Sequence, residues 1–203
     1  MKSAFTLLEL AVVLVIIALV MGIGFSSSQD MIASANQVST NNRLDAIEKA
    51  LLDFWQKNGR LPCPADATLA ATNANYGIEA ANTNNNCAGG TPAANFTSAT
   101  NFYKAASGTV PVKTLGLPTD FMNDAWQRKI EYAVKPEFAT VGVRNRVPIK
   151  AASCVDNTAI KITDIGGSTR SSSAVYALIS YGKNGHGAYP STGSTRYNAA
   201  ATN

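Results

Sequence analysis

The chain has 203 residues and a formal net charge of +4, with 17 Lys and Arg against 13 Asp and Glu. The basic residues are scattered and form no run, so the excess of positive charge does not indicate a specific nucleic-acid site. The three cysteines and single histidine do not have the spacing of a zinc site.

An apolar run occupies residues 5–25 and contains one charge, Glu9. About twenty apolar residues at 1.5 Å per residue span roughly 30 Å, the thickness of a bilayer's hydrocarbon core. A cleaved secretory signal has a shorter apolar region of about 7 to 15 residues, so an anchor is favoured, with signal cleavage after Met21 as the alternative. Because Lys2 precedes the run and the next basic residue is Arg43, we expect a cytoplasmic N-terminus and a periplasmic remainder.

Glu9 is unusual in such a run. A charged residue near the centre of a membrane helix costs about 2.5 to 3.5 kcal/mol, less near the end, and usually marks function. In the first turn of a helix it is helped by the positive end of the helix dipole and by protonation. That interpretation explains why Glu9 is tolerated but gives it no purpose.

The stretch from Ala4 to Leu10, AFTLLEL, followed by the apolar run, resembles the N-terminus of type IV pilins and of the pseudopilins of type II secretion. The resemblance implies a leader at residues 1–4, which a prepilin peptidase removes by cutting before Phe5, and methylation of the new amine. It also implies that Glu9 pairs with the Phe5 amine of a neighbouring subunit in a filament. The family most often has Gly before the cut, and a pocket that excludes bulky side chains should accept Ala4.

The apolar pattern beyond the membrane run predicts that the helix continues over residues 26–58. Apolar residues recur at three- and four-residue steps and form one stripe of an amphipathic helix. Gly59 and the prolines that follow are a stop signal. The stripe consists of Met31, Ile32, Ala35, Val38, Leu44, Ile47, Leu51, Phe54 and Trp55.

Residues 62–110 are rich in Ala, Asn, Thr and Gly and predict a long surface loop. A disulfide between Cys63 and Cys87 is favoured, because it would close about half of this loop and stabilise the fold by about 3 kcal/mol. A periplasmic location permits such a bond. Pairing of either cysteine with Cys154 remains open.

Residues 111–203 predict an antiparallel β-sheet. Ile130, Tyr132 and Val134 alternate with more polar residues, the pattern of a half-buried strand. VGVRNRVPI predicts a hairpin around Arg144 and Asn145, and AIKITDI a further strand. SAVYALISYG is apolar on both faces, which favours a central strand. A core helix packed on three to five antiparallel strands is an α+β fold in one domain.

The loop before the strand at Ile130 contains Asp120, Asn123 and Asp124, whose oxygens are of the type that calcium prefers. Turn-capping is the favoured interpretation, so we predict no metal. The order of residues here is similar to that around the first sheet strand of many pseudopilins, through Asp124, Trp126, Arg128 and Tyr132.

No motif for catalysis is present, and His186 lies between glycines in a turn-rich stretch. We therefore expect no enzyme activity and no cofactor. The resemblance implies a pilin-like structural subunit of a pilus or pseudopilus, anchored in a bacterial inner membrane by a single pass. Its implied partners are other subunits, the prepilin peptidase and an assembly platform. A membrane-tethered periplasmic binding protein is the alternative, and pilus, secretion and DNA-uptake systems all remain open.

Overall fold

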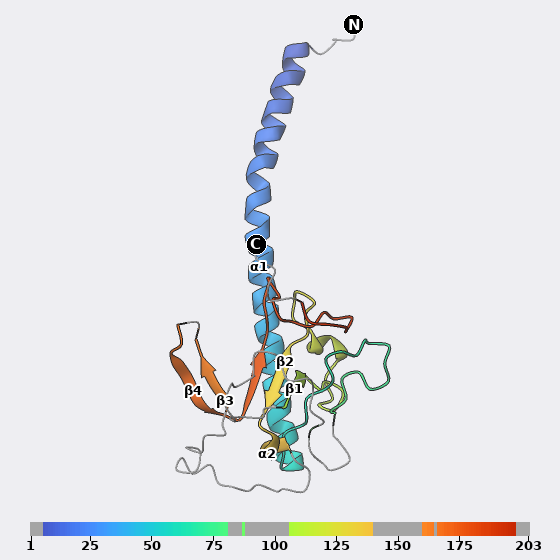
Figure 1. Cartoon of the computed structure of the whole chain (residues 1–203). Coiled ribbons are helices and arrows are strands. Elements are labelled where there is room, and N and C mark those ends of the chain that lie inside the picture. The colour runs from blue at the N-terminus through green and yellow to red at the C-terminus, as the bar shows by residue number, and fades with distance from the viewer. Residues whose placement is uncertain (1–5, 81–86, 88–105, 140–159, 165, 198–203) are drawn as a thin grey trace. The chain divides into compact units, whose positions relative to one another are not determined.

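The computed structural model describes residues 6–80, 87, 106–139, 160–164 and 166–197. Within these residues the chain is α+β, with two α-helices and two small antiparallel sheets (Figure 1). This confirms the α+β class of the predicted fold. The elements are α1 (Leu7–Asn58), β1 (Ala106–Thr109), the 3-10 helix η2 (Thr119–Met122), β2 (Glu131–Val134), α2 (Pro136–Ala139), β3 (Ile160–Thr163), β4 (Thr169–Ala174) and β5 (Tyr176–Ile179).

The chain divides into two compact units, Met1–Val38 and Ser39–Asn203, and α1 contributes to both. In the second unit, Ile47 and Leu51 of the predicted stripe are fully buried in the core. Each of these two side chains contributes about 1.5 to 3 kcal/mol, the value for fully burying an aliphatic side chain.

The helix ends where the sequence predicts. Gly59 has a φ of 69°, and its N–H donates to the carbonyl of Trp55 at 2.7 Å. A glycine in the left-handed region closes a helix at low cost, since it has no Cβ to clash with the preceding carbonyl. The stop at Asn58 is therefore a local property of the sequence.

The larger sheet has the strand order β1-β2-β5, with β2 antiparallel to both neighbours. All four residues of β2 are buried, whereas those of β5 are half-buried. The prediction that SAVYALISYG forms a central strand is wrong. That stretch is interrupted at Val175, its first residues belong to β4, and β5 is an edge strand of the sheet.

The first strand lies inside the stretch predicted as loop, residues 62–110. β1 has the sequence ASGT, and all four residues are buried. A Cβ on Gly108 would lie 2.3 Å from the carbonyl oxygen of Ala65, and Ala65 exchanges two backbone hydrogen bonds of 2.9 Å with Thr109. Small residues are required here because another backbone passes so close, and small residues give no strand signal in the sequence.

The smaller sheet pairs β3 with β4, and β3 lies in the predicted strand AIKITDI. Ile160 is buried, while the other residues of β3 are exposed. The predicted hairpin around Arg144 and Asn145 lies outside the described residues.

Candidate functional site

The predicted processing residues Ala4 and Phe5 lie outside the described residues. The structure begins at Thr6, immediately before α1, and Glu9 is in the first turn of that helix. The N–H of Glu9 donates to Oγ1 of Thr6 at 3.3 Å, and the N–H of Thr6 donates to Oε2 of Glu9 at 3.1 Å. The Thr6 hydroxyl also donates to Oε2 at 3.1 Å.

These contacts form a capping box, in which two residues three positions apart each satisfy a backbone N–H of the helix start. The Glu9 carboxylate also lies at the positive end of the helix dipole. Sequence reasoning missed this role, although the spacing of Thr6 and Glu9 is the signal for it. Pairing of Glu9 with a neighbour's amine stays a prediction.

The large apolar side chains of α1 between Leu7 and Leu19 are exposed, with exposed fractions from 45% at Ile17 to 89% at Leu7. Met31, Ile32 and Val38, the first large members of the amphipathic stripe, are exposed as well. Within the residues that the structure describes, no helix combines the length and apolar content that crossing a membrane requires.

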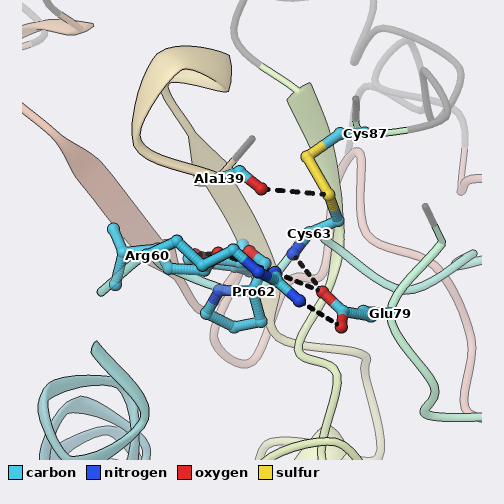
Figure 2. Close-up of a disulfide and its surroundings, with 8 residues drawn as sticks. Arg60, Pro62, Cys63, Glu79, Cys87 and Ala139 are labelled. Carbon is cyan, nitrogen blue, oxygen red and sulfur yellow. Dashed lines mark hydrogen bonds and ion pairs between the residues drawn. A yellow bond between two sulfur atoms is a disulfide. The ribbon is translucent and has the colours of Figure 1, made fainter. Parts of the chain in front are cut away.

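Cys63 and Cys87 form a disulfide with a Cα–Cα distance of 5.2 Å (Figure 2). This is the pairing that the sequence favoured, while Cys154 lies outside the described residues. Cys63 is fully buried, and its Sγ lies 3.9 Å from the carbonyl oxygen of Ala139. The bond therefore attaches the described part of the long loop to the core beside α2.

An ion pair between Arg60 and Glu79 also holds this part of the chain in place, next to Cys63 (Figure 2). The guanidinium of Arg60 donates from Nη1 and Nη2 to the two carboxylate oxygens of Glu79, each at 2.8 Å. The N–H of Cys63 donates to Oε2 of Glu79 at 3.0 Å. Burial alone would raise the pKa of the Glu79 carboxyl, but the hydrogen bonds from Arg60 and Cys63 and the charge of Arg60 outweigh it and lower that pKa.

The polar residues of the predicted half-buried strand are buried, which corrects that prediction. Lys129 is 2% exposed, and its Nζ donates to the carbonyls of Ala67 at 2.9 Å and Leu69 at 2.6 Å. The ammonium also lies 5.0 Å from the centre of the Tyr76 ring. Burial lowers the pKa of Lys129 to about 8, and the charge of Asp66 opposes this shift.

Glu131, the second charged residue of this strand, is 3% exposed and receives Nη2 of Arg196 on Oε1 at 2.9 Å and Nη1 on Oε2 at 3.1 Å. The hydroxyl of Tyr181 also donates to Oε2. Arg196 completes its contacts by donating to the carbonyl of Gly187 at 2.8 Å. The charged side chains of Lys129 and Glu131 are accommodated in and beside β2 because residues far away in the chain supply their partners.

The carboxylate of Asp124 is buried and caps a turn, as the sequence favoured. Oδ1 accepts the N–H groups of Trp126 and Arg128, both at 2.9 Å, and Oδ2 accepts the hydroxyl of Ser180 at 2.9 Å. Asp120 is exposed. Among the described residues, no group of three or more His, Cys, Asp or Glu side chains is placed to hold a metal ion.

A shallow groove of about 570 Å³ lies between the last turns of α1 and the turn at residues 113–117. Lys49, Lys57 and Lys113 line it together with Asp53, and Phe54 supplies an apolar surface. This arrangement has a positive rim but lacks a nucleophile paired with a base. His186 is exposed and does not line the groove.

Comparison of the chain with models of protein families, with curated proteins and with solved structures finds no match. The resemblance to pilins and pseudopilins therefore depends on the N-terminal residues themselves.

Proposed function

We propose that the chain is a structural subunit of a membrane-anchored filament of the type IV pilus class, either a pilin or a pseudopilin. The observation that carries the proposal is the stretch AFTLLEL at residues 4–10, in which one glutamate, Glu9, precedes a long apolar run. A carboxylate at the start of a membrane-seeking segment usually marks function, and helix capping alone does not require a charged residue there.

The arrangement of α1 supports a pilin-like architecture. The helix exposes apolar side chains from Leu7 to Leu19 and buries Ile47 and Leu51 in an α+β unit. A surface of contiguous exposed apolar side chains marks an interaction with lipid or with protein. In the proposed filament, residues 5–25 first lie in the inner membrane and then pack against the same segment of other subunits.

Glu9 supports a specific assembly contact. After cleavage, the amine of Phe5 is a cation at neutral pH, because its reference pKa is about 8. Both hydrogen bonds from Thr6 go to Oε2 of Glu9, and Oε1 accepts none from the described residues. A neighbour's amine bound at Oε1 would be compatible with the capping box. Such a buried pair sets register more than it adds stability, since both ions lose their hydration.

The disulfide supports the proposed location of residues 26–203. Disulfides form and persist in oxidising compartments such as the periplasm, and Cys63 and Cys87 form one here. The proposed subunit is thus a single-pass inner-membrane protein with a periplasmic unit. Its partners would be the prepilin peptidase, the assembly platform and other subunits.

Intact-mass and peptide analysis of the protein from its native membrane tests the proposal. We expect a mature chain that begins at Phe5 with a methylated amine. Ala4→Leu should retain the leader because the peptidase pocket excludes bulk, whereas Ala4→Gly should be processed normally. A membrane-tethered binding protein predicts an unmethylated N-terminus at another position and equal behaviour of the two variants, and that result would refute the filament proposal.

A further inference from the structure

Three backbone carbonyls of the segment from η2 to the turn before β2 converge on one side chain of α1. Nη1 of Arg43 lies 3.1 Å from the carbonyl oxygen of Asp120, 2.6 Å from that of Asn123 and 3.4 Å from that of Asp124. All four residues belong to the unit Ser39–Asn203. We refer to residues 120–124 as the carbonyl loop.

This contact differs from an ordinary set of hydrogen bonds. A guanidinium NH₂ group has two protons, so three oxygens around one nitrogen are held by its positive charge as well as by hydrogen bonding. Both carboxylate oxygens of Asp124 are used elsewhere, by backbone N–H groups and by Ser180. Among the described ion pairs, none involves Arg43, so the carbonyl dipoles provide its neutralisation.

The carbonyl loop has an excess of acceptor oxygens. Oδ1 of Asn123 is buried and accepts no hydrogen bond within the described residues. Several neutral oxygens that face one point are the environment in which proteins hold hard cations. Their dipoles repel one another unless a positive charge lies between them.

We propose that the carbonyl loop is a cation-binding site and that the guanidinium of Arg43 is its resident cation. The site fastens α1 to the segment before β2. Thr40, one helical turn earlier and 4% exposed, adds a second attachment, because its Oγ1 accepts the N–H of Ala125 at 3.1 Å. Arg43 thereby performs the role that a bound metal ion would otherwise have in ordering this loop.

The proposal predicts that removal of Arg43 leaves a vacant site that a small cation from solution fills. The probes are guanidinium, which matches the lost group, and Ca²⁺, which matches the oxygen ligands. The test measures the melting temperature of the full-length chain in detergent micelles. Arg43→Ala should melt about 3 to 8 °C below wild type, as expected when a half-buried charge-assisted hydrogen-bond group is lost from a domain of this size.

Millimolar guanidinium or Ca²⁺ should raise the melting temperature of Arg43→Ala by several degrees relative to sodium chloride of equal ionic strength. Neither cation should raise the melting temperature of wild type, because Arg43 already fills the site. Arg43→Lys should remain close to wild type without added cation, because an ammonium has three donors for three carbonyls. Lys49→Ala is the matched control on the same helix, since Lys49 is exposed and should show neither effect.

Hydrogen exchange of the peptide that contains residues 120–124 provides a second readout at a temperature where all variants are folded. Exchange should be faster in Arg43→Ala and should slow again when the effective cation is added. Equal stability of Arg43→Ala and wild type would overturn the proposal. It would also be overturned if neither cation stabilised or protected Arg43→Ala more than wild type.

Discussion

Glu131 and Arg196 form a two-point ion pair that joins the middle strand of the sheet to a segment 65 residues further along the chain. The side chain of Glu131 is 3% exposed and that of Arg196 is 18% exposed, so the pair is largely removed from water. The guanidinium also lies 4.6 Å from the centre of the Tyr189 ring. The pair therefore holds the segment after β5 against β2 by charge, planar geometry and ring contact together.

Removal of the cation from this pair should be costly. Arg196→Ala leaves the Glu131 carboxylate buried and unpaired, and we expect a loss of about 3 to 5 kcal/mol in the free energy of unfolding. Urea denaturation followed by circular dichroism measures this loss.

Arg170→Ala is the matched control. Arg170 lies 4.0 Å from Asp164, and its side chain is 73% exposed. A solvent-exposed pair contributes about 0 to 1 kcal/mol, so this variant should be nearly as stable as wild type. Similar losses for the two arginine variants would contradict the importance assigned to burial of the Glu131 pair.

The same network predicts an alkaline dependence of stability. Burial, together with the hydrogen bond to Glu131 and its charge, raises the pKa of Tyr181 to about 12, whereas an unfolded tyrosine titrates at about 10. Because the folded pKa is the higher one, the stabilisation is complete below pH 10 and is lost as the pH rises from about 10 to about 12.

As the pH is raised from 10 to 11.5, the free energy of unfolding of Tyr181→Phe should therefore fall by less than that of wild type. Urea denaturation at several pH values measures the slope. Tyrosinate absorbance of the folded protein gives an independent check, since one tyrosine that ionises near pH 12 should be missing in Tyr181→Phe. If the ionisation step that Tyr181→Phe removes lay near pH 10 instead, the prediction of a raised pKa for Tyr181 would be wrong.

The disulfide predicts a defined peptide map. Digestion without reductant should yield Cys63 joined to Cys87, with Cys154 outside this linkage. Reduction should lower the free energy of unfolding by about 3 kcal/mol, the chain-entropy value for a loop of this length. Cys154→Ser is the control and should change neither the linkage nor the effect of reduction. A dominant crosslink through Cys154 would contradict the pairing.

Several features that the sequence predicts correctly depend on neighbouring residues. Gly59 ends α1 because its own backbone adopts a φ of 69°. Helical spacing predicts the buried face that includes Ile47 and Leu51, although it does not show where along the stripe burial begins, since Val38 is exposed. Such signals are local in the chain, so one sequence is enough to find them.

The features that the sequence misses depend on partners far away in the chain. Lys129 and Glu131 look like the solvent face of a strand, but the carbonyls of residues 67 and 69 and the guanidinium of Arg196 cover them. β1 was missed because ASGT has little strand preference and pairs through its backbone with Ala65 and β2. The carbonyl loop is similar, since backbone oxygens carry no sequence signature.

Glu9 offers the most direct test of assembly, because the structure gives its carboxylate a local role in capping α1 with Thr6. Glu9→Gln keeps the capping box, which accepts Glu or Gln, but removes the charge that would pair with a neighbour's amine. Glu9→Leu removes both. Either variant should insert into the membrane at least as well as wild type, since a costly charge is gone.

Under the proposed pairing, both variants should nevertheless be depleted from sheared or crosslinked filaments when expressed beside wild-type partner subunits, because the neighbour's Phe5 amine would be buried without its counter-ion. Thr6→Ala is the matched control. It weakens the cap by about 0.5 to 2 kcal/mol but leaves the charge of Glu9 in place, so it should still be incorporated. If Glu9→Gln assembles as well as wild type while Glu9→Leu and Thr6→Ala do not, the helix cap and not the charge is what assembly requires, and the pairing mechanism fails.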